Sequence, residues 1–198
     1  VFRRPQVLLG LLTTVLGYAG VFAVFTYIAP ILTRISGFSE SAVSPLMLVF
    51  GAGLMIGNLA GGKLADRKLT PALIGSLITL TVVLALMSFA IQNAIASGIF
   101  VFLLGAAAFA TVPPLQMWVL EKASGAGQNL ASSFNIAAFN LGNAGGAWLG
   151  GVVIAQGPGL GFVTWAAALV TLSGLAVALL ALWLDAGRRH AVCPAPAE

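Results

Sequence analysis

Long runs without charged residues dominate this chain, and their lengths predict membrane-spanning helices. A helix needs about 20 apolar residues to cross a hydrocarbon core about 30 Å thick. Residues 5–33 hold one such crossing, and the uncharged runs 69–120 and 123–184 each hold two. The polar pair at 92–93 and the Gly-Pro-Gly string at 157–159 divide the two longer runs. We therefore predict an all-α membrane protein with six transmembrane helices, at about residues 7–32, 43–64, 69–91, 95–120, 130–154 and 162–184.

The ends of the chain complete this domain prediction. Residues 1–187 form one six-helix bundle, and residues 188–198, with Pro194 and Pro196, form a cytoplasmic tail without fixed structure. The charged pair Arg3 and Arg4 precedes an apolar run that is too long for a signal peptide. Because the chain begins without Met, we expect it to be a piece of a longer protein or a processed one.

Composition supports a membrane protein and excludes several other classes. The chain is 60% hydrophobic and 7% charged, with a mean hydropathy of +1.05, which leaves too little polar surface for a soluble domain. The net charge of +4 is spread in small basic groups between apolar runs, so we expect no nucleic-acid partner. The single Cys193 and the single His190 lie in the tail. We therefore expect no disulfide framework, no metal site and no cofactor.

The distribution of basic residues predicts the orientation in the membrane. Short cytoplasmic loops collect Lys and Arg. With six crossings, one membrane face carries Arg34 alone, whereas the other carries Arg3, Arg4, Lys63, Arg67, Lys68, Lys122, Arg188 and Arg189. We therefore expect a multi-pass protein of the bacterial inner (plasma) membrane with both termini in the cytoplasm.

Amide side chains indicate which helices face protein or water, because they are costly in lipid. The third and sixth spans contain none, so we place these two at the lipid-facing periphery. Asn58 lies in the second span and Gln116 in the fourth. The fifth span carries a polar stripe about 100° wide, made of Asn129, Ser132, Ser133, Asn140 and Asn143. Two interpretations of the stripe stay open: it lines a water-filled cavity, or it holds neighbouring helices together.

Glycine and proline positions predict close helix packing and a kink. Glycines recur at every fourth residue in two spans, and we expect them to pack against other helices: Gly53, Gly57 and Gly61, and Gly142, Gly146 and Gly150. Pro113 and Pro114 remove two backbone donors and should kink the fourth span near Gln116. The strings at 57–62 and 142–146 are alike, and they lie on the second and fifth spans. This correspondence fits two inverted three-helix repeats.

The connection after the second span carries a recognisable motif. Residues 61–69 read GGKLADRKL, in which Gly62, Asp66 and Arg67 match a loop pattern of the form G-x-x-x-D-R-x-G-R-[RK]. The second half of the pattern is replaced by Leu69, Thr70 and Pro71. This loop resembles the signature of the major facilitator superfamily, in the degenerate form found in the C-terminal half. Residues 25–39 and 128–144 are similar to the arabinose-efflux-permease-like and drug:proton antiporter branch.

The resemblance implies a twelve-helix transporter, of which this chain is the C-terminal six-helix half, and a mechanism of alternating access. Its partners would be the lipid bilayer, a small-molecule substrate, and an N-terminal six-helix half or a second copy of the chain. Gly62, Asp66 and Arg67 would form a gating loop in which Asp66 latches one conformation. The alternative is that Asp66 only pairs with Arg67 or Lys63 in a hydrated loop.

The substrate and the coupling are less defined by the sequence. No Asp, Glu, Lys, Arg or His lies deep in any predicted span, so a proton-carrying group would belong to the other half. Tyr27, Gln116, Asn140 and Asn143 are the candidate binding residues, and they suit a neutral or amphipathic solute such as a sugar or a drug-like molecule. We expect a proton-coupled efflux transporter and no enzyme, because the spans offer no catalytic constellation. A channel or a structural membrane subunit is the alternative function.

Overall fold

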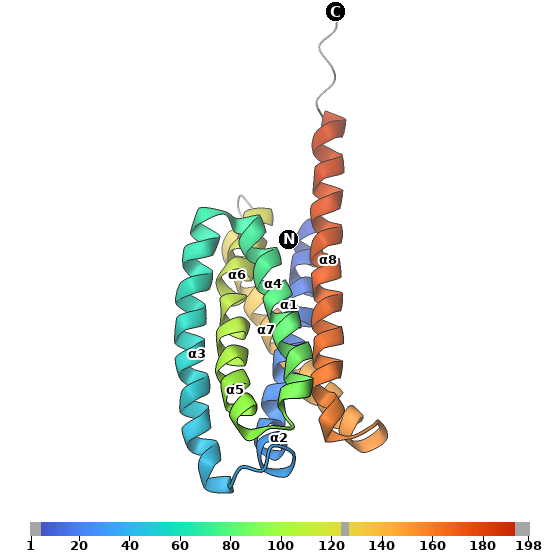
Figure 1. The fold of residues 1–198 in the computed structure, drawn as a ribbon. Coiled ribbons are helices and arrows are strands. Elements are labelled where there is room, and N and C mark those ends of the chain that lie inside the picture. The colour runs from blue at the N-terminus through green and yellow to red at the C-terminus, as the bar shows by residue number, and fades with distance from the viewer. Residues whose placement is uncertain (1–4, 124–126, 193–198) are drawn as a thin grey trace, which may run out of the picture.

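The computed structural model describes residues 5–123 and 127–192, which form helices joined by short connections (Figure 1). The elements are α1 (Pro5–Thr26), α2 (Ile28–Arg34), α3 (Glu40–Arg67), α4 (Leu69–Ala90), α5 (Ala94–Ala110), α6 (Val112–Lys122), α7 (Gln128–Gln156), the 3₁₀ helix η1 (Leu160–Phe162) and α8 (Val163–Val192).

These elements make six crossings of the bundle. The first consists of α1 with α2, the fourth of α5 with α6, and the sixth of η1 with α8; α3, α4 and α7 each make one crossing. Within the described residues, five segments are both long and apolar enough to span a membrane, and α7 is the crossing that is not among them. Its amides and glycines lower its hydropathy, although it has 29 residues and packs along α1. The predicted all-α membrane fold is confirmed.

Prolines determine where the first and fourth crossings break. A proline ring clashes with the carbonyl four residues earlier and cannot donate a backbone hydrogen bond to it. Accordingly α1 ends at Thr26, four residues before Pro30, and α5 ends at Ala110, four residues before Pro114. Each broken crossing then resumes as a second helix, so the predicted kink of the fourth crossing is a break at Thr111.

The helices form two layers that obey an inverted-repeat relation. The most extensive contacts are those of α3 with α5 and of α1 with α7. Helices α4 and α8 pack against each other and behind this row, α4 on α5 and α8 on α1. In this relation the first, second and third crossings correspond to the fourth, fifth and sixth. The contact of α3 with α5 then corresponds to the contact of α7 with α1, and the contact of α4 with α5 corresponds to that of α8 with α1. The row α3, α5, α1, α7 is called the inner face below.

Glycines allow the closest helix approaches on this inner face. A Cβ atom at Gly53, Gly57 or Gly61 would collide with the backbone of α5, at Phe102, Ala106 and Ala110 respectively. A Cβ at Gly142 would lie 2.7 Å from the carbonyl oxygen of Val15 on α1. Gly146 faces the carbonyl of Ala19 in the same way, and Gly150 faces the ring of Tyr27. The two glycine series therefore occupy equivalent places in the two repeats.

Charged residues gather at one end of the bundle. The α3–α4 connection and the ends of α6 and α8 lie at the same end, and α2 lies at the other (Figure 1). At the first end the Lys122 Nζ atom lies 2.6 Å from Asp185 Oδ2, which ties α6 to α8. Helix α8 continues to Val192, beyond the expected start of the tail at residue 188, because no proline precedes Pro194 there. The rest of the predicted tail, residues 193–198, lies outside the described part of the chain, as do Arg3 and Arg4.

Candidate functional site

A cavity of about 290 Å³ lies in the inner face, near the middle of the bundle. Four helices contribute to its wall, α1, α3, α5 and α7. The lining residues are Tyr18, Val21, Phe22, Phe25, Phe50, Leu54, Phe109 and Asn143. Tyr18, Leu54, Phe109 and Asn143 lie close to the middle of their own crossings, which places the cavity near the midplane of the membrane.

Aromatic rings form a continuous wall from α7 to α3. Tyr18 meets Phe139 edge-on, with ring centroids 4.7 Å apart, and lies 5.8 Å from Phe22. Phe22 continues to Phe25 at 5.6 Å, and Phe25 stacks on Phe50 at 4.9 Å with an interplanar angle of 26°. The positions 18, 22 and 25 are spaced by four and three residues, so they share one face of α1. Such ring pairs contribute about 0.5–1.5 kcal/mol each beyond buried area, which favours a fixed wall.

Two polar groups at the cavity have no hydrogen-bond partner among the described residues. The Asn143 Oδ1 atom is buried and unpaired. The Tyr18 hydroxyl also donates to and accepts from no described residue, although the side chain is only 6% exposed. A buried acceptor without a partner costs about 1–3 kcal/mol. The cavity therefore offers an amide oxygen and a phenol to a bound molecule, and none of the described residues that line it carries a carboxylate or an amine.

Of the four binding residues chosen from the sequence, Asn143 lines this cavity, and Tyr27, Gln116 and Asn140 do not. The Tyr27 hydroxyl donates to the Ala147 carbonyl at 3.0 Å, which joins α1's end to α7. Asn140 is exposed on α7, and its Nδ2 donates to the Ile136 carbonyl of the same helix at 3.0 Å.

Gln116 belongs instead to a chain of hydrogen bonds that joins α1, α6 and α7. The Thr14 hydroxyl donates to Asn135 Oδ1 at 2.8 Å, and Asn135 Nδ2 donates to Gln116 Oε1 at 2.6 Å. Gln116 Nε2 then donates to Ser132 Oγ at 2.8 Å. The polar stripe of α7 therefore divides, since Ser132 holds helices together whereas Asn143 faces a cavity.

The predicted gating residues lie on a helix rather than in a loop. Gly62, Asp66 and Arg67 occupy the last two turns of α3, and Lys68 alone separates α3 from α4. Asp66 is exposed and makes no ion pair within the described residues, including with Arg67 or Lys63. A carboxylate in the last turn opposes the helix dipole by about 0.3–1 kcal/mol. The position of Asp66 is therefore not explained by any contact in this bundle.

The aromatic residues of the cavity are not distinguished by the sequence pattern. The chain has 12 Phe, and phenylalanine is equally suited to lipid-facing and inward positions, so composition does not single out Phe50 or Phe109. One signal was available on α1, where Tyr18, Phe22 and Phe25 follow the helical spacing of a single face.

Comparison with known proteins now identifies the family. The model of the Major Facilitator Superfamily matches residues 10–197, nearly the whole chain. The chain belongs to the major facilitator superfamily. The expected resemblance to this superfamily is thus confirmed.

Named relatives agree with this assignment. The chain is 47% identical over 180 residues to the inner membrane transport protein YdhP of Escherichia coli strain K12, which covers 91% of the chain and 46% of YdhP. It is 36% identical to the putative transporter AraJ of the same strain, over 90% of the chain and 45% of AraJ. It is 30% identical to the purine ribonucleoside efflux pump NepI of Shigella sonnei, over 77% of the chain and 38% of NepI. The chain thus spans about half the length of these relatives.

Proposed function

We propose that this chain is the C-terminal half of a secondary active efflux transporter that exports flat, neutral, amphipathic solutes by alternating access. The observation that carries the proposal is the aromatic cavity with its unpaired Asn143 oxygen, placed near the midplane on the inner face. A site at this depth is reached from both membrane surfaces in turn when two bundles rock about it.

The cavity chemistry supports the solute class. The chain of rings from Tyr18 to Phe50 offers stacking surface to a planar molecule. The Asn143 oxygen accepts one hydrogen bond from a donor on that molecule. No charged side chain lines the cavity, so an ionised solute would be desolvated without a counter-charge. A nucleoside, which the name of the relative NepI implies as its cargo, a drug-like aromatic compound or an amphipathic sugar derivative meets these requirements.

The inner face also favours a protein partner over lipid. Helix α3 has only 17% of its span residues buried, against 61% for α1. Its exposed surface combines the large apolar side chains of Met55 and Leu59 with the amide of Asn58, which has no hydrogen-bond partner among the described residues. Lipid cannot satisfy such an amide. A second six-helix bundle, either an N-terminal half or another copy, would cover this face.

Asp66 supports a contact with that second bundle. Its carboxylate is exposed at the end of α3 and has no ion pair in the described residues. A helix N-terminus or an arginine from the other bundle would compensate its charge in one conformation only, which is what a latch requires. We place this end of the bundle in the cytoplasm of the inner membrane because the basic residues gather there. Proton coupling would use a titratable group of the other half.

The test is transport into inverted bacterial membrane vesicles that contain the full-length protein, energised by a proton gradient. We expect saturable accumulation of radiolabelled inosine, no accumulation of the charged inosine monophosphate, and loss of accumulation with an uncoupler. Asn143→Leu should reduce inosine transport about tenfold, because it removes one hydrogen bond worth roughly 1.4 kcal/mol. The matched control is Asn140→Leu, an equal change one turn earlier on α7 that does not touch the cavity.

The outcomes separate the proposal from its alternatives. Equal loss in both variants, or loss in Asn140→Leu alone, would show that the cavity is not the solute site. Ion current across a planar bilayer without saturable solute uptake would establish the channel alternative. Expression level and a monodisperse elution profile in detergent must match between the variants, so that a folding defect is not taken for a transport defect.

A further inference from the structure

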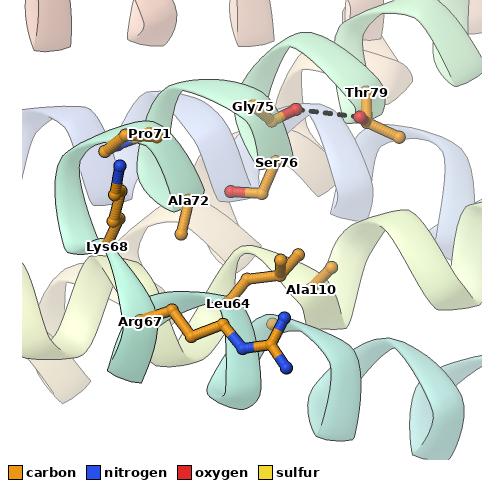
Figure 2. A pocket seen from close by; sticks show the side chains of 10 residues that line it. Leu64, Arg67, Lys68, Pro71, Ala72, Gly75, Ser76, Thr79 and Ala110 are labelled. Atoms are coloured by element: carbon orange, nitrogen blue, oxygen red, sulfur yellow. Dashed lines mark hydrogen bonds between the residues drawn. The ribbon is translucent and has the colours of Figure 1, made fainter.

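A second and larger cavity, of about 620 Å³, lies away from the proposed solute site, between α3, α4 and the end of α5. It is called the α3–α4 groove here, and its lining residues are Gly61, Leu64, Arg67, Lys68, Pro71, Ala72, Gly75, Ser76, Thr79 and Ala110. In Figure 2, Ala72 and Ser76 of α4 face Leu64 of α3 and Ala110 across the groove.

Small residues hollow out the groove. Ala72 and Gly75 of α4 leave space where larger side chains would fill the gap between the helices, whereas Gly61 and Ala110 lie in close contact at its floor. A Cβ atom at Gly75 would meet nothing within 4 Å. The two hydroxyl groups in the wall do not make it polar, because each donates to a carbonyl of its own helix. Ser76 bonds to Leu73 at 3.0 Å and Thr79 bonds to Gly75 at 2.8 Å, the latter drawn in Figure 2. The wall is therefore apolar along α4.

Two cations lie where α3 turns into α4; in Figure 2 Lys68 extends beside Pro71, whereas Arg67 extends toward Leu64. Arg67 and Lys68 are both exposed, line the groove, and make no ion pair within the described part of the chain. No acidic residue lines it, although Asp66 lies next to Arg67 on α3. The attraction of a cation to the C-terminal dipole of α3 explains why basic residues suit this position. This attraction to the dipole does not explain why an apolar cavity begins at Arg67 and Lys68.

The length of the groove matches one leaflet. Thr79 lies eleven residues beyond Lys68 on α4, which corresponds to about 16 Å of helix. Half of a hydrocarbon core is about 15 Å thick. A molecule with an anionic head at Arg67 and Lys68 and an apolar tail reaching Thr79 therefore has the dimensions and charge of a phospholipid in a single leaflet.

We propose that the α3–α4 groove binds one anionic phospholipid, with its phosphate between Arg67 and Lys68 and one acyl chain along Leu64, Ala72 and Gly75. Basic pockets between membrane helices recognise anionic headgroups in this manner. The proposal requires only that the bundle lies in a membrane, and it does not depend on the solute, the direction of transport or the proposed partner.

The test is native mass spectrometry of the full-length protein, purified in detergent and titrated with phosphatidylglycerol or with phosphatidylcholine of the same acyl chains. We expect the protein to bind one phosphatidylglycerol at much lower concentration than phosphatidylcholine. The double variant Arg67→Gln, Lys68→Gln should weaken phosphatidylglycerol binding about 25-fold, because each of the two side-chain charges contributes about fivefold. Lys63→Gln is the control for a single neutralised charge at this membrane surface, because it lies one turn before Arg67 on α3 and outside the groove; it should weaken binding much less than fivefold.

A second variant tests the apolar part of the site without changing any charge. Gly75→Leu places a side chain into open space, so it should fold and should exclude the acyl chain from the groove. Binding of phosphatidylglycerol should fall at least tenfold, whereas glycerol phosphate should fail to compete in the unaltered protein. The proposal is overturned if Lys63→Gln weakens binding as much as the double variant, if Gly75→Leu has no effect, or if the unaltered protein binds both lipids equally. It is also overturned if the groove is occupied by another segment of the full-length protein.

Discussion

Replacing one buried glycine of α3 by alanine should separate steric packing from helix propensity. A Cβ atom at Gly57 would lie 2.7 Å from the carbonyl carbon of Ala106 and 2.8 Å from its Cα, and it would overlap the carbonyl oxygen. These atoms belong to the backbone of α5, which cannot rotate away as a side chain does. Ordinary contact with the Ala106 carbonyl oxygen therefore requires α3 and α5 to move apart by more than about 1 Å.

The expected magnitude follows from two opposing effects. Overpacking of this kind costs about 1–3 kcal/mol, whereas alanine stabilises a helix interior by about 1 kcal/mol over glycine. Gly51→Ala supplies the control, because it lies on the same helix and its Cβ would meet nothing within 4 Å. Both variants gain the same helix propensity from alanine. The free energy of unfolding of Gly57→Ala should therefore be about 1–3 kcal/mol lower than that of Gly51→Ala.

The assay is unfolding in mixed dodecyl maltoside and SDS micelles, followed by tryptophan fluorescence. Trp118 is 1% exposed and should report loss of the core. By the repeat relation, Gly146→Ala and its open neighbour Gly145→Ala on α7 should differ in the same direction. Equal unfolding midpoints for Gly57→Ala and Gly51→Ala would refute the argument, since α3 would then not be held at the separation described.

Three further predictions concern polar groups. Asp66→Asn should slow solute transport severalfold while membrane insertion stays unchanged and the unfolding midpoint does not fall; unchanged transport kinetics in vesicles would exclude the latch. Neutralising Lys122 alone should lower the unfolding midpoint more than the double variant with Asp185→Asn, because a single change leaves one half-buried charge unpaired; equal midpoints would contradict this. Asn135→Leu should destabilise the bundle by about 1 kcal/mol, and a double-mutant cycle with Gln116→Leu should show coupling; strict additivity would argue against their hydrogen bond.

The crossings and the membrane fold follow directly from the sequence because lipid imposes a length and an apolar composition on each helix. The break before Pro114 follows for a similar reason, since the missing donor and the steric clash are local properties of the residue. Even α7, which is less apolar than its neighbours, is predicted from the sequence. The uncharged run between Lys122 and Asp185 is long enough to cross the membrane twice, and α7 supplies one of the two crossings.

The site is less accessible from the sequence because it depends on contacts between distant segments. Asn143 was selected as a rare polar group in a span, and the same reasoning selected Gln116, which makes helix contacts instead. Nothing local distinguishes the two amides, because only the rotation of each helix decides which one meets open space. Phe50 was missed for the opposite reason, since an apolar ring is expected anywhere in a membrane helix.

The two helix breaks lie at different depths, and this has a mechanical consequence. The break at Tyr27 is near the α2 end of the first crossing, whereas the break at Thr111 is nearer the opposite end of the fourth. Each side of the bundle thus has one helix break nearer to it, and the two breaks belong to different repeats. Under the proposed alternating access, a substitution that stiffens one break should trap the molecule open to a single side, so the two opposite trapped forms can be sought by changing these two places separately.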